Sequence, residues 1–200
     1  MRATLARRLT GSKNEINLRK VACGEPATVS NPQIQSAFES MSLGQIVGTS
    51  RWIAVDQPMI DAFGRATLDP DPMHIDPAWA RQHGPFGGTI AFGFLTISLL
   101  THLLHDALGS APNRDSYERG YYLNYGFDRL RLVSPVKAGA RVRGVFRLAG
   151  RDVDERQRYV ATFDCTLEIE DEERPALVAT WLTVWVPPER EGRSGGTADA

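Results

Sequence analysis

Apolar and polar positions alternate in the second half of the chain, and a period of two residues is typical of β-strands. The clearest alternation runs from residue 159 to residue 169, where every second residue is apolar. Residues 177–186 are apolar on both faces, which is typical of a central or interface strand. Together with residues 121–133 and 141–148, these segments give four predicted strands.

The segment between residues 89 and 108 has a different pattern and predicts a long helix. Its apolar residues point in almost every direction around the helix axis, and a helix that is apolar all round is buried. At 1.5 Å per residue this helix is about 30 Å long, so other elements must cover it. We therefore predict an α+β domain in which an antiparallel sheet curls around the helix.

Shorter elements are predicted ahead of the long helix. Asp56 and Asp76 are each followed closely by a proline, a pattern typical of a capped helix N-terminus. The first of these helices must end by Leu68, because Pro70 and Pro72 prevent its continuation. The predicted order is a strand over 52–55, a helix from Asp56, a loop over 69–76 and a short helix over 77–82.

The length of 200 residues suggests one domain with tails. We predict that residues 41–186 form the domain and that residues 1–40 are a poorly ordered N-terminal extension. Residues 187–200 are rich in Pro, Gly and charge and predict a disordered tail. An alternative for the first segment is that the protein starts at Met41, where the patterned sequence begins.

Charge and composition exclude several classes of partner. The 23 basic and 24 acidic residues give a net charge of -1, so neither nucleic acid nor an anionic membrane is expected as a partner. No apolar run reaches the roughly 20 residues that a membrane-spanning helix needs. The two cysteines, Cys23 and Cys165, form no CxxC pair, which argues against a metal site and favours a reducing cytoplasm.

Three segments together carry a resemblance to a known family. Residues 61–98 contain Asp69, then His74 five residues later, then Asp76 two residues after that. The run GPFGGTIAFGFLTISLL follows, and NYGFDRLRLVSPVKAG begins at Asn124. The chain resembles the MaoC-like (R)-specific enoyl-CoA hydratases, and most closely their nodulation-protein-N-like branch, because these segments occur in the same order.

The resemblance implies a hot-dog fold and a lyase that hydrates a trans-2-enoyl thioester or dehydrates a 3-hydroxyacyl thioester. Asp69 and His74 would hold one water and transfer its protons. Histidine suits this chemistry, because its ordinary pKa of about 6.5 lets it accept or donate a proton near neutral pH. The enolate oxygen that develops needs hydrogen-bond donors, and free amides at a helix N-terminus can supply them.

The same resemblance assigns the remaining site and the partners. The oxyanion and substrate-binding residues would be Gly88, Phe92, Gly93 and Ser98. For Ser98, a hydroxyl that bonds the previous helical turn is an alternative. No cofactor or metal is implied. The expected partners are an acyl-CoA or acyl-carrier thioester and a second copy of the chain; Trp181 and Trp185, expected to be exposed on one face of the sheet, agree with this homodimer.

Three departures from the family pattern keep other functions open. Leu68 stands where glycine is frequent, Asp71 where an amide is frequent, and Phe92 where histidine is frequent. A hot-dog module that binds acyl thioesters without hydrating them is therefore one alternative. A hot-dog thioesterase is another, although the spacing from Asp69 to His74 argues against it. Arginines at 129, 131, 141, 143 and 147 could contact coenzyme A phosphates or form a solvated sheet face.

Overall fold

The computed structural model describes residues 41–109, 121–156 and 158–186. The helices are α2 (Gln57–Thr67), α3 (Pro72–Ile75), α4 (Pro77–His83) and α5 (Gly93–Ala107). The strands are β1 (Ile46–Thr49), β2 (Ile53–Ala54), β3 (Tyr121–Leu132), β4 (Arg141–Val153), β5 (Tyr159–Ile169) and β6 (Leu177–Val186). These elements make an α+β arrangement, as the sequence predicts.

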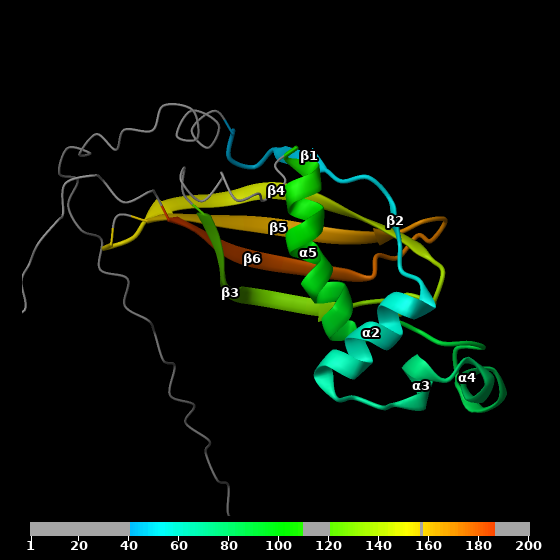
Figure 1. Cartoon of the computed structure of the whole chain (residues 1–200). Coiled ribbons are helices and arrows are strands. Elements are labelled where there is room, and N and C mark those ends of the chain that lie inside the picture. Colours follow the sequence, from blue (N-terminus) through cyan, green and yellow to red (C-terminus); the bar gives the residue numbers. More distant parts are fainter. Residues whose placement is uncertain (1–40, 110–120, 157, 187–200) are drawn as a thin grey trace, which may run out of the picture. The chain divides into compact units, whose positions relative to one another are not determined.

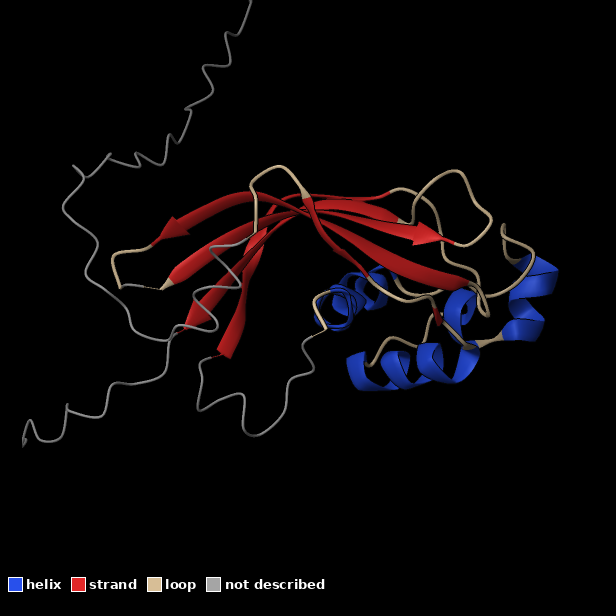
Figure 2. Ribbon diagram, turned by 90° about the horizontal axis from the view of Figure 1, so that it is seen from above, coloured by secondary structure: helices blue, strands red, loops and turns tan. Residues whose placement is uncertain are grey.

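The six strands form one antiparallel sheet. Its order is β1-β4-β5-β6-β3, and β2 pairs with the start of β4, ahead of the part that pairs with β1. The helices lie on one face of this sheet (Figure 2), and α5 crosses that face (Figure 1). The helices α2, α3 and α4 gather at the N-terminal end of α5 (Figure 1). The sheet and α5 therefore position the segment between α2 and α4, which carries Asp69 and His74.

The core lies between α5 and the sheet. Phe146, Phe163 and Leu167 from the sheet and Leu100 and Leu103 from α5 are at most 1% exposed. Burial on this scale is the main stabilising contribution in a domain of this size. The C-terminal end of α5 packs tightly on β1, where a Cβ at Gly48 would lie 2.5 Å from the carbonyl oxygen of Ala107.

Most of the predicted strand limits are confirmed. β5 and β6 have the predicted bounds, whereas β4 continues to Val153 instead of ending at Leu148. The long helix begins at Gly93 and not at Thr89, because residues before it are tied to another segment. The N–H of Ala91 donates to the carbonyl of Val136 at 2.7 Å. That bond holds the chain extended up to Phe92.

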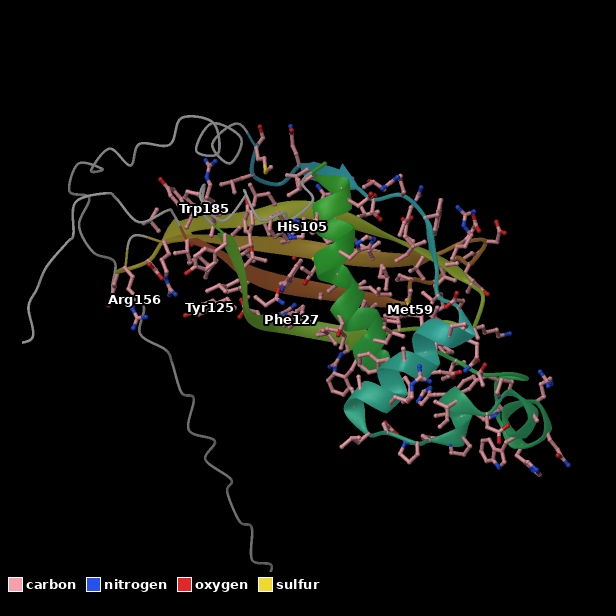
Figure 3. All side chains as sticks on the ribbon, in the orientation of Figure 1. Met59, His105, Tyr125, Phe127, Arg156 and Trp185 are labelled. Carbon is pink, nitrogen blue, oxygen red and sulfur yellow. The ribbon has the colours of Figure 1, made fainter. Side chains whose placement is uncertain are left out.

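Two predictions about exposure are wrong. The sheet covers only one side of α5, and Phe94 on the other side is 76% exposed among the described residues. Trp181 and Trp185 are buried, at 2% and 3% exposed, because they lie on the face of β6 that points toward α5. Several large exposed apolar side chains instead lie on β3, where Figure 3 labels Tyr125 and Phe127.

The predictions for residues 1–40 and 187–200 concern segments outside the described residues, so the domain limits stay a prediction. Within the described part of the chain, every helix falls short of the length and apolarity that a bilayer crossing requires.

Candidate active site

Asp69 begins the segment that follows α2. Asp56 caps the start of α2 by accepting from the N–H of Met59 at 2.9 Å, as the sequence predicts. Leu68 ends the helix in the left-handed conformation, with a φ of 59°. The N–H groups of Leu68 and Asp69 both turn back to the carbonyl of Gly64. This tight turn directs the chain away from α2 and leaves the Asp69 carboxylate exposed.

A one-turn helix, α3, carries His74 within the segment predicted as a loop. The prediction of loop throughout 69–76 is therefore wrong. Asp71 caps α3 by accepting from the N–H of Met73 at 2.9 Å, and Pro72 occupies its first position. The carboxylate of Asp69 accepts from the N–H of Asp71 at 3.2 Å. Asp71, which differs from the amide that is frequent in the family, thus stabilises α3 as its N-cap.

The imidazole of His74 is fixed in one tautomer. Its Nδ1 lies 2.7 Å from the backbone carbonyl oxygen of Ile90. A carbonyl oxygen only accepts hydrogen bonds, so Nδ1 carries the proton and Nε2 of the neutral ring has a free lone pair. The ring also stacks on Phe92, with centroids 3.9 Å apart and a 33° angle between the planes. His74 is therefore oriented with Nε2 ready to accept a proton.

Gln57 ties α2 to both segments that hold His74. Its side-chain nitrogen donates to the carbonyl of His74 at 2.8 Å and to the carboxylate of Asp61 at 2.7 Å. Its side-chain oxygen accepts from the hydroxyl of Thr89 at 2.5 Å. Gln57 is thus a second support for the site that the sequence reasoning missed. A Gln at the first position of a helix carries no sequence signal of such a role.

Gly64 and Phe92 form the support beneath the two predicted catalytic residues. A Cβ at Gly64 would lie 3.1 Å from the Asp69 carbonyl oxygen, from the Ile75 side chain and from the Phe92 ring. Phe92 is only 4% exposed, and its ring also packs on Phe63 with centroids 5.4 Å apart. The segments with Asp69 and His74 therefore converge on the same face of α2. Phe92 lies under the imidazole, and its contact with a substrate stays a prediction.

The N-terminus of α5 begins directly after the residues that hold His74. Phe92 is its N-cap and makes no side-chain capping bond, and Gly93 is the first helical residue. The first amides of a helix have no acceptor within it and carry a partial positive charge. A Cβ at Gly93 would lie 2.4 Å from the Leu132 side chain of β3. Gly93 thus permits close packing of the helix end on that strand.

The other predicted binding residues lie on either side of this helix end. Gly88 is half-buried in the loop between α4 and α5, and a Cβ there would meet no atom within 4 Å. The hydroxyl of Ser98 donates to the carbonyl of Phe94 at 2.8 Å, as the alternative for this residue anticipates. Asp76 caps α4 through the N–H groups of Ala78 and Trp79.

The five arginines considered for coenzyme A phosphates do not lie together. Arg129 and Arg131 are on β3, and the other three are on β4, with β5 and β6 between them. Neighbouring strands are about 4.8 Å apart, so the two groups are separated by roughly 14 Å. Arg141 and Arg143 also pair with Glu170 and Glu168. One joint phosphate site is therefore not present on this face of the sheet.

Metal ligands do not cluster in the described residues: His, Cys, Asp and Glu side chains nowhere form a group of three that could hold an ion. The polar groups of the candidate site are a carboxylate, an imidazole and backbone amides. Such a set can hold a water molecule, move a proton and stabilise a developing oxyanion.

Comparison with known proteins places the chain in a family. Residues 38–168 match the MaoC-like domain. The chain is 46% identical to nodulation protein N of Rhizobium leguminosarum bv. viciae over 142 residues, which is 71% of this chain and 85% of that protein. It is 35% identical to 3-hydroxyacyl-thioester dehydratase Z of Mycobacterium tuberculosis over 154 residues, covering 74% of this chain and 97% of that protein.

A solved structure agrees on the fold. The (R)-hydratase from A. caviae matches with a TM-score of 0.56 at 21% identity, covering 72% of this chain and 97% of that one. The likeness concerns the antiparallel sheet and the long helix on its face, which is the hot-dog fold. The fold inferred from the resemblance is thus confirmed. With the match over residues 38–168, the chain belongs to the MaoC-like domain family.

Proposed function

We propose that the protein reversibly hydrates trans-2-enoyl thioesters to (R)-3-hydroxyacyl thioesters. The observation that carries this proposal is the bond from His74 Nδ1 to the Ile90 carbonyl, which leaves Nε2 as a proton acceptor. The membership of the MaoC-like domain family supports it, as does the relative named a 3-hydroxyacyl-thioester dehydratase.

In the proposed reaction, one water is held between the Asp69 carboxylate and His74 Nε2. The water oxygen bonds to C3 while a proton leaves it for this pair, and the electron pair of the C2–C3 double bond moves toward the thioester oxygen. The free amides at the start of α5, from Gly93 onward, would stabilise that oxygen. Return of a proton to C2 completes the addition, and dehydration follows the same steps in reverse.

The direct test follows the absorbance of the conjugated enoyl thioester when the protein is added to crotonyl-CoA and to longer homologues. We expect the absorbance to fall, and Asp69→Asn and His74→Gln each to lower kcat by roughly 10²- to 10⁴-fold. Asp152→Asn, on the exposed end of β4, is the matched control and should keep full activity. Unchanged turnover in Asp69→Asn would overturn the assignment.

Two other outcomes point to the alternatives. Release of free thiol from an acyl-CoA would identify a thioesterase. Tight binding of acyl-CoA with no turnover at any chain length would identify a binding module. Reversion of Leu68 to Gly and Phe92 to His would then test whether those departures from the family pattern removed activity.

We also propose that the protein forms a homodimer through β3. Among the described residues, β3 pairs only with β6, so no strand lies beside the other edge of β3 over residues 123–132. Its exposed side chains include Leu123, Tyr125 and Phe127, with Tyr125 62% exposed. An open apolar edge of this length favours pairing with a second strand. Light scattering should give a mass twice that of one chain. Tyr125→Lys should lower the measured mass toward that of a monomer. A monomeric mass for the wild type would overturn the proposal.

We propose that this chemistry takes place in the cytoplasm. Cys165 is a free, buried thiol, and free cysteines persist in reducing compartments.

A further inference from the structure

A groove runs between α5 and β3 and leads away from the candidate active site. Two cavities form it and share Thr101, Asn124 and Trp181. The outer cavity, about 320 Å³, begins at Ile97 and Ser98, one helical turn beyond Gly93. The inner cavity, about 70 Å³, extends to Leu108 at the far end of the helix. At 1.5 Å per residue, the start of α5 lies about 12 Å from Thr101.

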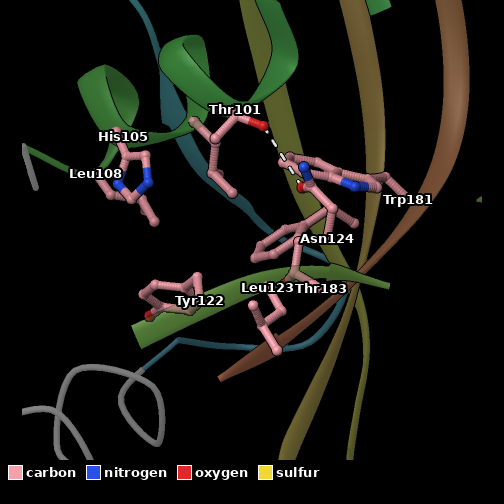
Figure 4. A pocket seen from close by; sticks show the side chains of 10 residues that line it. Thr101, His105, Leu108, Tyr122, Leu123, Asn124, Trp181 and Thr183 are labelled. Atoms are coloured by element: carbon pink, nitrogen blue, oxygen red, sulfur yellow. Dashed lines mark hydrogen bonds between the residues drawn. The ribbon is translucent and has the colours of Figure 1, made fainter. Parts of the chain in front are cut away.

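The inner cavity, shown in Figure 4, has apolar walls, the side chains of His105 and Tyr122, and a separate polar patch. Leu104, Phe163 and Trp181 are among the apolar lining residues. The polar patch consists of Thr101, Asn124 and Thr183. Asn124 on β3 lies directly opposite Thr183 on β6, and the Thr101 hydroxyl faces the Asn124 side-chain oxygen at 3.5 Å. Three elements thus bring their polar side chains to one point of the groove.

Thr183 is the feature of this patch that points to a ligand. Thr183 is 2% exposed, and its hydroxyl has no hydrogen-bond partner among the described residues. A buried hydroxyl without a partner costs free energy, so such groups are normally satisfied. One water needs roughly 10–15 Å³ of such volume, and the cavity of about 70 Å³ is several times larger. The space therefore suits a larger group that carries a hydrogen-bonding atom.

The lining of the inner cavity indicates that this group is neutral. Its ten lining residues include one histidine, His105, but no Lys, Arg, Asp or Glu. Partial burial raises the pKa of the Tyr122 phenol to about 12, so this neighbour is uncharged at neutral pH. The hydroxyl of Thr183 can donate or accept, and the amide of Asn124 does both. A hydroxyl or keto oxygen matches these groups.

We propose that the inner cavity binds a neutral oxygen substituent, a hydroxyl or keto group, on the acyl chain of the substrate, far from the thioester. The preferred substrates are then oxygenated acyl thioesters and not plain hydrocarbon ones. This inference rests on the proposed function for where the thioester lies, namely at the start of α5. The length of the groove sets the distance between the reacting carbons and the oxygen.

The test compares trans-2-enoyl-CoA substrates of increasing length, each plain, with a terminal hydroxyl, or with a keto group near the end. The wild type should prefer one oxygenated series by about tenfold in kcat/KM at one chain length. Thr183→Val keeps the shape and removes the hydroxyl, so it should abolish that preference. Thr180→Val makes the same change on β6 where the hydroxyl bonds Asp164 instead, and should leave the preference intact.

The outcomes separate this proposal from the proposed function. Turnover without a preference, or a preference that survives in Thr183→Val, overturns the oxygen subsite and leaves hydration standing. If no substrate turns over, calorimetry with saturated acyl-CoA pairs replaces kinetics. A tighter Kd for the oxygenated ligand that Thr183→Val abolishes would then support the subsite without the reaction, and equal Kd values would overturn it.

Discussion

The side-chain amide of Gln57 donates a hydrogen bond to the backbone carbonyl of His74, with 2.8 Å between nitrogen and oxygen. The same residue binds Asp61 and Thr89, so one side chain joins α2, α3 and the segment before α5. Ile90, which holds the imidazole nitrogen, directly follows Thr89. Gln57 therefore acts on His74 through its backbone carbonyl and through the segment that binds Nδ1, without needing to touch a substrate.

Gln57→Leu should lower kcat while leaving KM nearly unchanged. The change removes the bond to His74 and the bond to Thr89, which precedes the Ile90 carbonyl that binds the ring. Losses of supporting bonds of this kind typically cost 10- to 100-fold in activity. Steady-state kinetics with the proposed substrate measure this. Gln57→Glu keeps the acceptor for Thr89 but sets a carboxylate against the Asp61 carboxylate and the His74 carbonyl, so it should not recover kcat. Gln82→Leu on α4 is the exposed control; equal losses in both Leu variants would contradict a positioning role.

Leu68→Gly should make the protein more stable. Leu68 has a φ of 59°, a conformation that costs a residue with a side chain roughly 1–2 kcal/mol. Its side chain is 88% exposed, so little packing is lost on its removal. After the greater flexibility of glycine in the unfolded chain is subtracted, we expect a gain of about 0.5 kcal/mol in the free energy of unfolding.

Urea unfolding measures this gain, and Leu68→Ala is its control. Alanine keeps a Cβ in the left-handed conformation, so it should not raise the midpoint. A lower midpoint for Leu68→Gly would show that the Leu68 side chain makes a stabilising contact.

Gly64→Ala should destabilise the protein, against the usual effect in a helix. Alanine normally stabilises a helix interior by about 1 kcal/mol relative to glycine. Here the new methyl would lie 3.1 Å from each of three neighbours, including the Phe92 ring that supports His74. Overpacking of this kind costs about 1–3 kcal/mol, so we expect a net loss and a lower kcat.

The control for this prediction is Gly88→Ala, whose methyl would meet no atom within 4 Å. Thermal unfolding of both variants gives the comparison, and a raised Tm in Gly64→Ala would contradict the close packing at that position.

The bond between Arg51 and Asp106 should make stability depend on pH. Hydrogen bonds from the Arg51 guanidinium and N–H hold the pKa of the Asp106 carboxyl below its ordinary value. A lowered pKa means that the carboxylate stabilises the fold above about pH 4 and that this contribution is lost as the pH falls through the native pKa. Asp106→Asn should therefore be less stable than wild type at pH 7.

Urea unfolding over a pH series should show the difference between wild type and Asp106→Asn shrinking below about pH 4. Arg51→Gln should give the same profile, because it removes the donor of the same pair. A difference that stays constant with pH would show that the pair contributes no linked protonation.

The sheet could be predicted from the sequence because its alternation is local. The bounds of β5 and β6 follow from residue type alone. The start of α5 could not be predicted, since it depends on the bond from Ala91 to Val136, a partner distant in sequence. The burial of Trp181 and Trp185 was missed for a similar reason. Both faces of β6 are apolar, and only the position of α5 distinguishes them.

Some residues of the candidate site could likewise be predicted from the sequence, and others could not. Asp69 and His74 are predicted as catalytic residues because the family pattern contains them, and the cap at Asp56 could be predicted because a proline follows it closely. Gln57 and Ile90 gave no signal, since Gln57 acts through side-chain bonds to distant residues and Ile90 through its backbone. Leu68 was identified as a departure from the pattern, and its left-handed φ supplies the physical reason that glycine suits the position.

The partner of His74 Nδ1 is a main-chain oxygen. Every amino acid that could replace Ile90 would bring the same carbonyl, so no single substitution at that position deletes the acceptor. The position of the backbone therefore determines which nitrogen of the imidazole carries the proton. Substitutions can change the tautomer only if they shift the backbone at Ile90. Changes at Gln57, Thr89 and Phe92 would do so most directly.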